Sequence, residues 1–291
     1  MTPPTRPLEP GLHLVATPIG AARDITLRTL DVLSAADLLA AEDTRSLRRL
    51  LEIHGVDLKG RHIVAYHDHN GARMRPRLLQ ALRDGQSVAY AAEAGTPMVA
   101  DPGYRLVEAA IAEGHPVRAA PGPSAVLAAL TVSGLPSDRF LFAGFPPQQT
   151  AARRRFLAEI KDVPATLILF ESPRRVGDLL TDLVLEMGPD RRAVICRELT
   201  KRFENVSRGT LGTLQEAVDT RMLKGEIVVL IDRAPVAQTD ADTLKGALKG
   251  ALDRATLKDA VSQVATRFGM PRRKVYQAAL ELRDDGEGGD P

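Results

Sequence analysis

Ala92-Glu93-Ala94-Gly95-Thr96-Pro97 directly follows an apolar segment, Ser87 to Tyr90, that is typical of a short buried β-strand. In a parallel sheet the carboxyl ends of the strands form one edge, where helix N-termini and free backbone N–H groups can meet a ligand. Gly95 lets a ligand approach the backbone closely, and Pro97 stiffens the loop. The stretch therefore indicates a site for a flat ligand held mainly by backbone atoms, although a sharp strand-to-helix turn without a ligand would have the same pattern.

The amino-terminal half repeats this order of segments. Five times an apolar segment is followed by a polar loop and then by a stretch with helical spacing of apolar residues. The expected strands are residues 12–16, 38–41, 63–65, 87–90 and 117–119. Strands that alternate with helices favour a parallel sheet whose loops gather on one edge, so we expect an α/β domain over residues 12–135.

Beyond residue 135 the pattern changes. Further strands are expected at residues 140–143, 166–170, 193–197, 202–207 and 226–231, with helices at 150–160, 173–187 and 213–221. Only a short turn around Leu199 separates two of these strands, which is typical of an antiparallel pair. The pattern predicts a second α/β domain with a mixed sheet over residues 136–233, followed by a linker over 234–242.

The carboxyl-terminal segment, residues 243–284, has another pattern. Residues 256–268 carry apolar side chains at helical spacing, Gly269-Met270-Pro271 interrupts them, and a basic helix is expected at 272–283. This order is typical of a helix-turn-helix, although a small packing bundle without a nucleic-acid role would show the same spacing. The candidate contacts to the phosphates of a nucleic acid, RNA or DNA, are Arg272, Arg273 and Lys274.

Composition excludes several classes of protein. The 291 residues are 44% hydrophobic and 26% charged, which is ordinary for a globular protein, and no apolar run approaches the ~18 residues of a membrane helix. Residues 1–11 hold four prolines and no apolar core of a signal peptide. A single cysteine, Cys196, excludes an internal disulfide, and no zinc-ligand spacing is present. We therefore expect a cytoplasmic protein that uses no metal and binds no membrane.

Net charge is only +2, but arginines cluster locally along the chain. Local positive potential attracts phosphate backbones more than the sum of charges does. Arg153-Arg154-Arg155, on an expected helix, is a further candidate for the phosphates of RNA or DNA, and a solvated helix face is the alternative.

Polar residues in three other loops are candidates for chemistry. His67-Asp68-His69 follows the expected strand at 63–65 and could form a metal site, supply a proton acceptor or only brace a surface loop. Asp43 could be a helix N-cap, and Glu171-Ser172-Pro173 could be a helix start. No P-loop and no Gly-x-Ser-x-Gly motif is present.

A set of short motifs, in order along the chain, closely resembles one family. The motifs are Thr17-Pro18-Ile19-Gly20, Glu42-Asp43-Thr44-Arg45, Tyr66-His67-Asp68-His69-Asn70, Ala94-Gly95-Thr96-Pro97, Asp101-Pro102-Gly103-Tyr104, Pro121-Gly122-Pro123-Ser124, Glu171-Ser172-Pro173, Arg197-Glu198-Leu199-Thr200-Lys201 and Lys224-Gly225-Glu226. The family is that of the bacterial small-subunit ribosomal RNA cytidine 2′-O-methyltransferases, in the tetrapyrrole methylase superfamily. The resemblance runs from about Leu12 to Ile231, and the family also has a carboxyl-terminal helix-turn-helix-like extension.

The resemblance implies S-adenosylmethionine in a cleft between two α/β domains, a homodimer, and a substrate in small-subunit (16S) ribosomal RNA. The residues that it assigns to the cofactor are Thr17, Pro18, Gly20, Glu93, Ala94, Gly95, Thr96, Pro97, Pro121, Ser124, Ala125, Glu171, Ser172, Gly225 and Glu226. Two positions depart from the family pattern: Ala92-Glu93 stands where the family has Ser-Asp, and Ala21 stands where it has Asn.

For such a reaction the protein chiefly has to align the acceptor oxygen with a methyl group that is already activated, and to exclude water. A ribose hydroxyl is a weak acid, so a nearby base would help, and residue type and loop position make His67 and Asp43 the candidates. The RNA must present a splayed nucleotide. Two alternatives stay open. The first is a methyltransferase of a small tetrapyrrole-like substrate, although Thr17-Pro18-Ile19-Gly20 lacks the Gly-Pro-Gly-Asp-Pro pattern expected in such enzymes. The second is a non-catalytic RNA-binding regulator.

Overall fold

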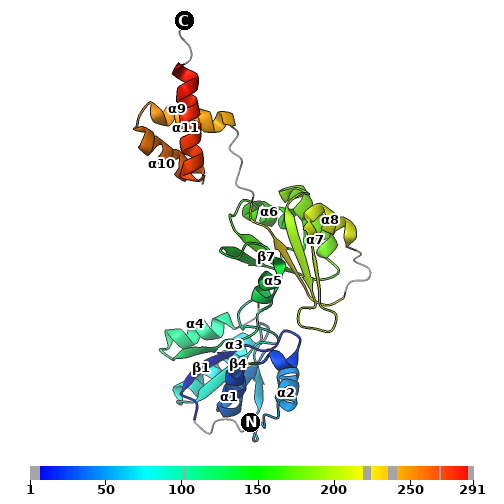
Figure 1. Cartoon of the computed structure of the whole chain (residues 1–291). Coiled ribbons are helices and arrows are strands. Elements are labelled where there is room, and N and C mark those ends of the chain that lie inside the picture. The colour runs from blue at the N-terminus through cyan, green and yellow to red at the C-terminus, as the bar shows by residue number, and fades with distance from the viewer. Residues whose placement is uncertain (1–6, 101–102, 219–223, 235–240, 269, 288–291) are drawn as a thin grey trace. The chain divides into compact units, whose positions relative to one another are not determined.

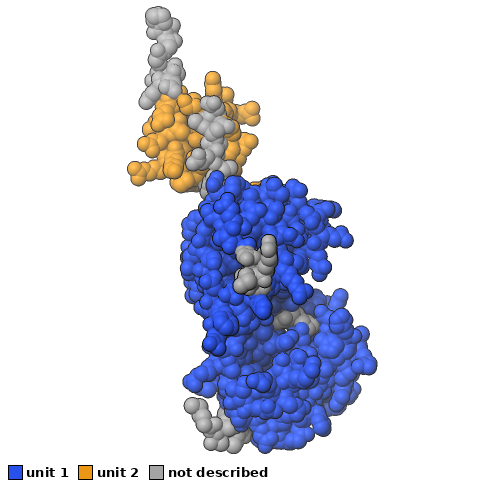
Figure 2. Space-filling model, turned by 90° about the vertical axis from the view of Figure 1, so that its right-hand side faces the viewer, with its two compact units in different colours: residues 1–161, 165–232 blue, residues 162–164, 233–291 orange. Residues whose placement is uncertain are grey.

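The computed structural model describes residues 7–100, 103–218, 224–234, 241–268 and 270–287. The chain divides into two compact units, residues 1–161 with 165–232 and residues 162–164 with 233–291 (Figure 2). Both sheets belong to the first unit, and the carboxyl-terminal helices belong to the second (Figure 1). The expected boundary between residues 135 and 136 lies inside the first unit, so the division into two α/β domains stays a prediction. Asp101 and Pro102, part of one motif, lie outside the described residues.

The first sheet is parallel throughout, with the strand order β3-β2-β4-β1-β5. Its strands are β1 (Gly11–Val15), β2 (Leu38–Ala41), β3 (Ile63–Ala65), β4 (Ser87–Ala91) and β5 (Val117–Ala120). They lie where the apolar segments predicted them, and the parallel arrangement is confirmed. Val15, the last residue of β1, pairs with Ala91 of β4 and Ala120 of β5, so the loops that follow these strands leave the same edge of the sheet.

Helices cover both faces of this sheet. The covering helices are α1 (Leu27–Ala35), α2 (Thr44–Ile53), α3 (Gly71–Arg83) and α4 (Tyr104–Ala112). The 3₁₀ helix η1 (Ala22–Asp24) follows β1 and buries no residue, and α5 (Ala125–Ser133) packs against the second sheet. One apolar cluster joins Tyr90 to Leu78 of α3 and Leu106 of α4, and another joins Val15 to Leu33 of α1 and to α2. Because successive side chains of a strand point to opposite faces, strands covered on both sides are apolar throughout.

The second sheet is mixed, with the order β6-β7-β10-β8-β9, and only β6 and β7 are parallel. Its elements are β6 (Phe140–Gly144), α6 (Thr150–Ile160), β7 (Thr166–Glu171), α7 (Val176–Met187), β8 (Arg192–Arg197), β9 (Asn205–Thr210), α8 (Leu211–Ala217) and β10 (Ile227–Ile231). The antiparallel pairing of β8 with β9 confirms what the short turn around Leu199 indicated.

Three expected boundaries in this half were wrong. β9 begins at Asn205 and not at residue 202, because the Thr200 N–H donates to the Glu204 carboxylate (2.5 Å) and closes a turn before the strand. α7 begins at Val176 and not at residue 173, because a turn closed by the Arg175 N–H on the Ser172 carbonyl (3.1 Å) precedes it. α8 ends at Ala217, and residues 219–221 of the expected helix lie outside the described residues.

The second unit contains α9 (Ala241–Leu252), α10 (Leu257–Phe268) and α11 (Arg272–Glu287). Leu248, Val264 and Val275, one from each helix, lie in a common apolar core. α9 was not predicted, because Gly246 and Gly250 lower helix propensity and tertiary packing overrides it. Among the described helices of the chain, none is long and apolar enough to cross a membrane.

Candidate active site

The loops after β1 and β4 are joined at the carboxyl edge of the first sheet. The backbones of Thr17 and Gly95 pair through two hydrogen bonds of 2.9 and 3.0 Å. The Thr17 side chain is buried, and its hydroxyl donates to the carbonyl of Ala92 (3.3 Å). Gly95 has a φ of 78°, in the left-handed region that glycine adopts without strain. These contacts hold the Gly95 loop in one position at the sheet edge.

A third loop, between β5 and α5, packs against the same place. The Thr96 hydroxyl donates to the carbonyl of Pro123 (2.9 Å), and a Cβ atom on Gly122 would lie 2.9 Å from the Cβ atom of Ala16. Ser124 is the N-cap residue of α5, but its hydroxyl makes no capping hydrogen bond. The first N–H groups of a helix have no partner within the helix, so this N-terminus favours a negatively charged or acceptor group.

The second sheet contributes the ends of β7 and β10. Glu171 is 3% exposed, and its Oε1 atom accepts the N–H of Ser172 (2.7 Å). Its Oε2 atom is buried without a hydrogen bond, although Arg175 Nη2 lies 3.2 Å away as an ion-pair partner. Arg175 also donates to the carbonyl of Pro146 (2.9 Å), which ties the loop after β6 to the start of α7. Glu171 therefore holds this wall in place through the N–H of Ser172 and the guanidinium of Arg175.

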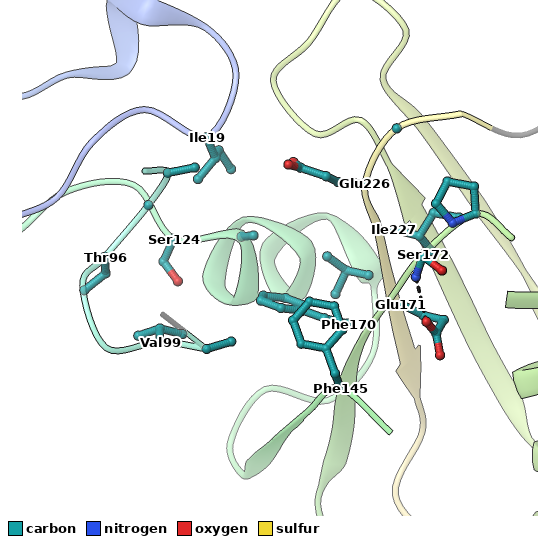
Figure 3. Close-up of a pocket in the computed structure, with 17 residues that line it drawn as sticks. Ile19, Thr96, Val99, Ser124, Phe145, Phe170, Glu171, Ser172, Glu226 and Ile227 are labelled. Carbon is teal, nitrogen blue, oxygen red and sulfur yellow. Dashed lines mark hydrogen bonds between the residues drawn. The ribbon is translucent and has the colours of Figure 1, made fainter. Parts of the chain in front are cut away.

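These segments enclose a cavity of about 320 Å³, which we call the first cavity. Its lining comes from both halves of the first unit: Ile19, Ala94, Gly95, Thr96, Val99, Ala100, Ser124, Ala125, Phe145, Phe170, Glu171, Ser172, Pro173, Gly225, Glu226, Ile227 and Val228. Phe145 and Phe170 lie against each other with ring centroids 5.5 Å apart. Figure 3 shows the Glu226 side chain extending toward Ile19 on the opposite wall. The first cavity thus has apolar and aromatic walls with few charged groups.

The structure brings nine of the predicted cofactor residues to this lining: Ala94, Gly95, Thr96, Ser124, Ala125, Glu171, Ser172, Gly225 and Glu226. The other six, Thr17, Pro18, Gly20, Glu93, Pro97 and Pro121, are not part of it. Gly20 instead lies against the turn between β8 and β9, where a Cβ atom on Gly20 would be 2.6 Å from Thr200 Oγ1. The backbone N–H of the next residue, Ala21, donates to the Thr200 hydroxyl (3.2 Å). Ala21, one of the departures from the family pattern, therefore makes this contact through its backbone.

The sequence interpretation missed the apolar part of the lining. Val99 and Ala100 follow the predicted loop, Phe145 follows β6, and Phe170, Ile227 and Val228 lie in β7 and β10. Phe145 stands directly after an expected strand, which was a usable signal. The strand residues carried none, because which of their side chains face the first cavity depends on the register of the second sheet.

Carboxylates gather beside the first cavity. The Glu93 N–H donates to Glu42 Oε2 (3.2 Å). Partial burial raises the pKa of the Glu93 carboxyl, and the neighbouring carboxylates of Glu42, Asp43 and Glu226 raise it further. Glu93, the second departure from the family pattern, therefore lies in a field of negative charge.

Asp43 has the N-cap role that was one of its two interpretations. Its Oδ1 atom accepts the N–H groups of Arg45 (2.7 Å) and Ser46 (3.1 Å) at the start of α2. These backbone hydrogen bonds lower the pKa of the Asp43 carboxyl, which makes it a weaker proton acceptor. A catalytic role for Asp43 stays a prediction.

His67 lines a second cavity of about 480 Å³. Ala100 is shared with the first cavity, and the remaining lining residues are Tyr66, Asp68, Gly71, Ala72, Arg75, Gly103, Tyr104 and Arg105. The backbone N–H of His67 donates to Asn70 Oδ1 (2.9 Å), and the Asn70 amide donates to the carbonyl of Ala65 (3.0 Å). The loop is thus braced by Asn70 and not by the imidazole. No cluster of three metal-ligating side chains occurs among the residues that the structure describes.

The three arginines of α6 differ in their surroundings. Arg153 is buried and paired with Asp182, which argues against the predicted contact of this residue with RNA. Arg154 is exposed and lies 3.1 Å from Glu186, and Arg155 is exposed. Residues next to each other on a helix point in different directions, which a cluster in the sequence does not reveal.

On α11, Arg272, Arg273 and Lys274 are all exposed. Arg272 donates to the hydroxyl of Ser262 (2.9 Å) on α10. Arg272 and Arg273 line a groove between the two helices, whereas Lys274 lies outside it.

Comparisons with known proteins match nearly the whole chain. The family model of the Tetrapyrrole (Corrin/Porphyrin) Methylases matches residues 11–215, and that of the RsmI C-terminal HTH domain matches residues 237–283. The Ribosomal RNA small subunit methyltransferase I of Mesorhizobium japonicum is 49% identical over 292 residues, which cover 98% of each chain. That of Escherichia coli O157:H7 is 40% identical over 274 residues, which cover 93% of this chain and 94% of its own.

Solved structures share the arrangement of the first unit. A diphthine synthase superposes with a TM-score of 0.59 and 18% identity, covering 76% of this chain and 89% of its own. A uroporphyrin-III C-methyltransferase from Thermus thermophilus, complexed with S-adenosylhomocysteine, superposes with a TM-score of 0.52 and 21% identity, covering 76% of this chain and 96% of its own. At these identities the likeness shows the fold.

Proposed function

Because the chain belongs to the tetrapyrrole methylase family and, within it, to the ribosomal RNA small subunit methyltransferases I, we propose that it transfers a methyl group from S-adenosylmethionine to the ribose 2′-hydroxyl of a cytidine in 16S ribosomal RNA. The resemblance seen in the sequence motifs is confirmed at the level of the family. The observation that supports the proposed chemistry is the pair of adjoining cavities that share Ala100. One suits a small cofactor, and the other carries basic side chains.

The first cavity fits S-adenosylmethionine in size and chemistry. Its volume of about 320 Å³ lies within the range of small-molecule sites. Ile19, Val99 and Phe170 offer apolar surface to the adenosyl group and the methylene groups of the cofactor, while the N-terminus of α5 offers backbone N–H groups to the cofactor carboxylate. Glu226 supplies a carboxylate for the cofactor's cationic groups, and Lys201 Nζ, 3.1 Å from its Oε2 atom, shares that negative charge. The nine predicted residues that line this cavity are the proposed cofactor contacts.

Bound S-adenosylmethionine supplies a methyl group on a positively charged sulfur, which is already activated for transfer. The protein therefore has to orient the acceptor and exclude water. Ala100 has the smallest side chain that carries a Cβ atom and stands in both walls, so an acceptor in the second cavity can reach the first. Arg75 and Arg105 of the second cavity are suited to the phosphates that flank the acceptor ribose.

His67 is the proposed proton acceptor for the 2′-hydroxyl. His67 belongs to the wall of the second cavity, where we place the acceptor nucleotide, and an imidazole is the most common general base in enzymes. Asp43 is the less favourable candidate, because its carboxylate is already engaged by two backbone N–H groups.

The partners follow from the substrate. The proposed substrate is 16S ribosomal RNA, free or within the small ribosomal subunit, which places the protein in the bacterial cytoplasm. The homodimer implied by the family resemblance is also a proposal, and sedimentation of the purified chain tests it.

The decisive experiment incubates the purified chain with S-adenosylmethionine labelled in its methyl group and with 16S RNA, free or in small subunits, from a strain that lacks the gene. We expect label on the ribose of a cytidine. Label on a base, or no label on either substrate while S-adenosylmethionine binds in titration, would contradict the proposal.

A further inference from the structure

The second unit has its own concave surface, which lies between α10 and α11. Leu257, Lys258 and Val261 of α10 face Arg272, Arg273 and Tyr276 of α11 across a groove of about 510 Å³, here called the α10–α11 groove. Because all its lining residues belong to the second unit, the groove does not depend on where that unit lies relative to the sheets.

The α10–α11 groove combines apolar, aromatic and cationic groups. Leu257 and Val261 provide an apolar surface, and Tyr276 is 46% exposed although it follows the fully buried Val275. A tyrosine that is exposed at this level leaves much of its ring area available for contact with a ligand.

The charge of the α10–α11 groove has one sign. Lys258, Arg272 and Arg273 line it, and no acidic side chain of the described residues does. Asp259, next to Lys258, accepts a hydrogen bond from the Thr256 hydroxyl (2.7 Å) at the start of α10. Arg272 is held by its hydrogen bond to Ser262 (2.9 Å). The positive potential at the groove is therefore complementary to a phosphate backbone.

We infer that the α10–α11 groove binds an unpaired nucleotide of RNA, with the base stacked on Tyr276 and the flanking phosphates near Lys258, Arg272 and Arg273. The inference rests on the proposed function only in taking RNA as the partner. An aromatic platform beside cationic side chains is the combination that binds single-stranded nucleic acid, because the faces of bases are available only where they are unstacked. The unit would thereby direct the enzyme to a single-stranded part of its substrate.

The test uses the full chain and two RNA oligonucleotides, one single-stranded and one a duplex of the same sequence. For Tyr276→Ala we expect the Kd for the single strand to rise about 5- to 150-fold, which is the measured range for losing one stacked base. The Kd for the duplex should change by less than about twofold. Tyr276→Phe keeps the ring and should bind within about twofold of the parent. Gln277→Ala, an exposed position on α11 outside the groove, is the matched control and should bind as the parent does.

Arg273→Gln tests the phosphate contacts. It should weaken all single strands alike and reduce the slope of log K against log salt by about 0.7. Circular dichroism melting of each variant separates a loss of contact from a loss of folding. If Tyr276→Ala does not fold, Tyr276→Leu, which keeps apolar bulk but removes the ring, takes its place.

Several results would overturn the inference. A folded Tyr276→Ala variant with the parent's affinity for the single strand would do so, as would an equal loss for strand and duplex, or a Tyr276→Phe variant as weak as Tyr276→Ala. If the groove binds a protein and not RNA, the folded Tyr276→Ala variant will keep the parent's affinity for the single strand. Methylation of 16S RNA by the parent is measured in the same preparation. Its absence contradicts the proposed function, whereas methylation with unchanged RNA binding by Tyr276→Ala contradicts only the inference.

Discussion

Arg153 and Asp182 form an ion pair inside the second half of the first unit: the Arg153 Nε atom lies 2.7 Å from Asp182 Oδ2, and the two side chains are 4% and 5% exposed. Arg153 Nη1 also donates to the carbonyl of Gln148 (3.1 Å). The pair joins α6 to α7, so the first arginine of Arg153-Arg154-Arg155 has a structural role.

Removing one partner of this pair should be costly. Asp182→Ala leaves a buried guanidinium without a countercharge and should lower the free energy of unfolding by about 3–5 kcal/mol. Glu186→Ala is the control, because it breaks the pair of Glu186 with the exposed Arg154 and should cost about 0–1 kcal/mol. Urea denaturation measures both. Equal costs for the two variants would show that the buried pair has no special role in stability.

The glycine at the sheet edge gives a second prediction. Gly95→Ala adds a Cβ atom 3.2 Å from Ile19 Cγ2, on the wall of the first cavity, and forces alanine into a φ of 78°. We expect a loss of stability of about 1 kcal/mol from the backbone and a weaker affinity for S-adenosylmethionine, by about tenfold, because the loop must shift. Calorimetric titration and thermal unfolding give the two values.

Gly85→Ala is matched to it. Gly85 has a φ of 74°, and an added Cβ atom would meet nothing within 4 Å. This control should lose similar stability and keep the parent's affinity for S-adenosylmethionine. If both variants bind the cofactor as the parent does, Gly95 is not part of its site.

The parallel sheet and the strand-end loops could be predicted from the sequence, because strands buried on both faces are apolar without interruption and end at polar loops. The aromatic wall could be predicted only in part, because Phe145 directly follows an expected strand but no local pattern pairs it with Phe170. Phe145 and Phe170 meet only when β6 and β7 pair in one register, which no local pattern specifies. The separate roles of Arg153 and Arg155 depend likewise on which side of α6 packs on α7.

Glu93 should make stability depend on pH. Partial burial and the carboxylates of Glu42, Asp43 and Glu226 raise its pKa above the usual 4.5. The folded state then binds more protons than the unfolded state, so this contribution to stability falls as pH rises above about 4.5 through the raised pKa. Glu93→Gln should therefore gain stability relative to the parent between about pH 4 and about pH 7, measured by urea denaturation.

Glu113→Gln is the control of opposite sign. Arg83 donates to Glu113 at 2.6 Å and lowers the pKa of its carboxyl, so its contribution is present above the unfolded-state pKa and lost as pH falls. This variant should lose stability relative to the parent as pH rises toward about 4.5, and the difference should stay constant above that pH. A Glu93→Gln variant whose difference from the parent is flat with pH would show that the nearby carboxylates do not act on Glu93.

The Cys196 thiol should be unreactive in the folded protein. It is fully buried in β8, and burial raises the pKa of its thiol to about 11. Only the thiolate reacts readily, so an aromatic disulfide reagent near neutral pH should modify it no faster than the protein unfolds. In urea the thiol should react at once. Complete modification of the native protein within seconds would mean that β8 opens locally.

The last prediction concerns His67. Its ring lines the second cavity, while the loop is held through the backbone N–H of His67 on Asn70 Oδ1, so His67→Ala leaves that brace in place. If the imidazole accepts the proton of the 2′-hydroxyl, the variant should lower the single-turnover rate of methylation by about 10²–10⁴-fold. The affinity for S-adenosylmethionine should stay the same, because His67 is not part of the first cavity.

The matched control is His69→Ala. His69 is exposed, lies two residues away in the same loop and is not part of either cavity lining. Its ring meets the His67 ring edge-on, with centroids 6.0 Å apart, so this variant removes that ring contact but keeps the proposed proton acceptor and should methylate RNA at close to the parent's rate. The pH–rate profile separates proton transfer from alignment: losing a base removes the acidic limb, whereas misplacing the acceptor lowers the rate equally at every pH. If His67→Ala methylates RNA at a rate within about threefold of the parent's and with the same pH dependence, His67 is not the proton acceptor. Alignment of the acceptor hydroxyl with the methyl group near Ala100 then accounts for the rate, and solvent takes the proton.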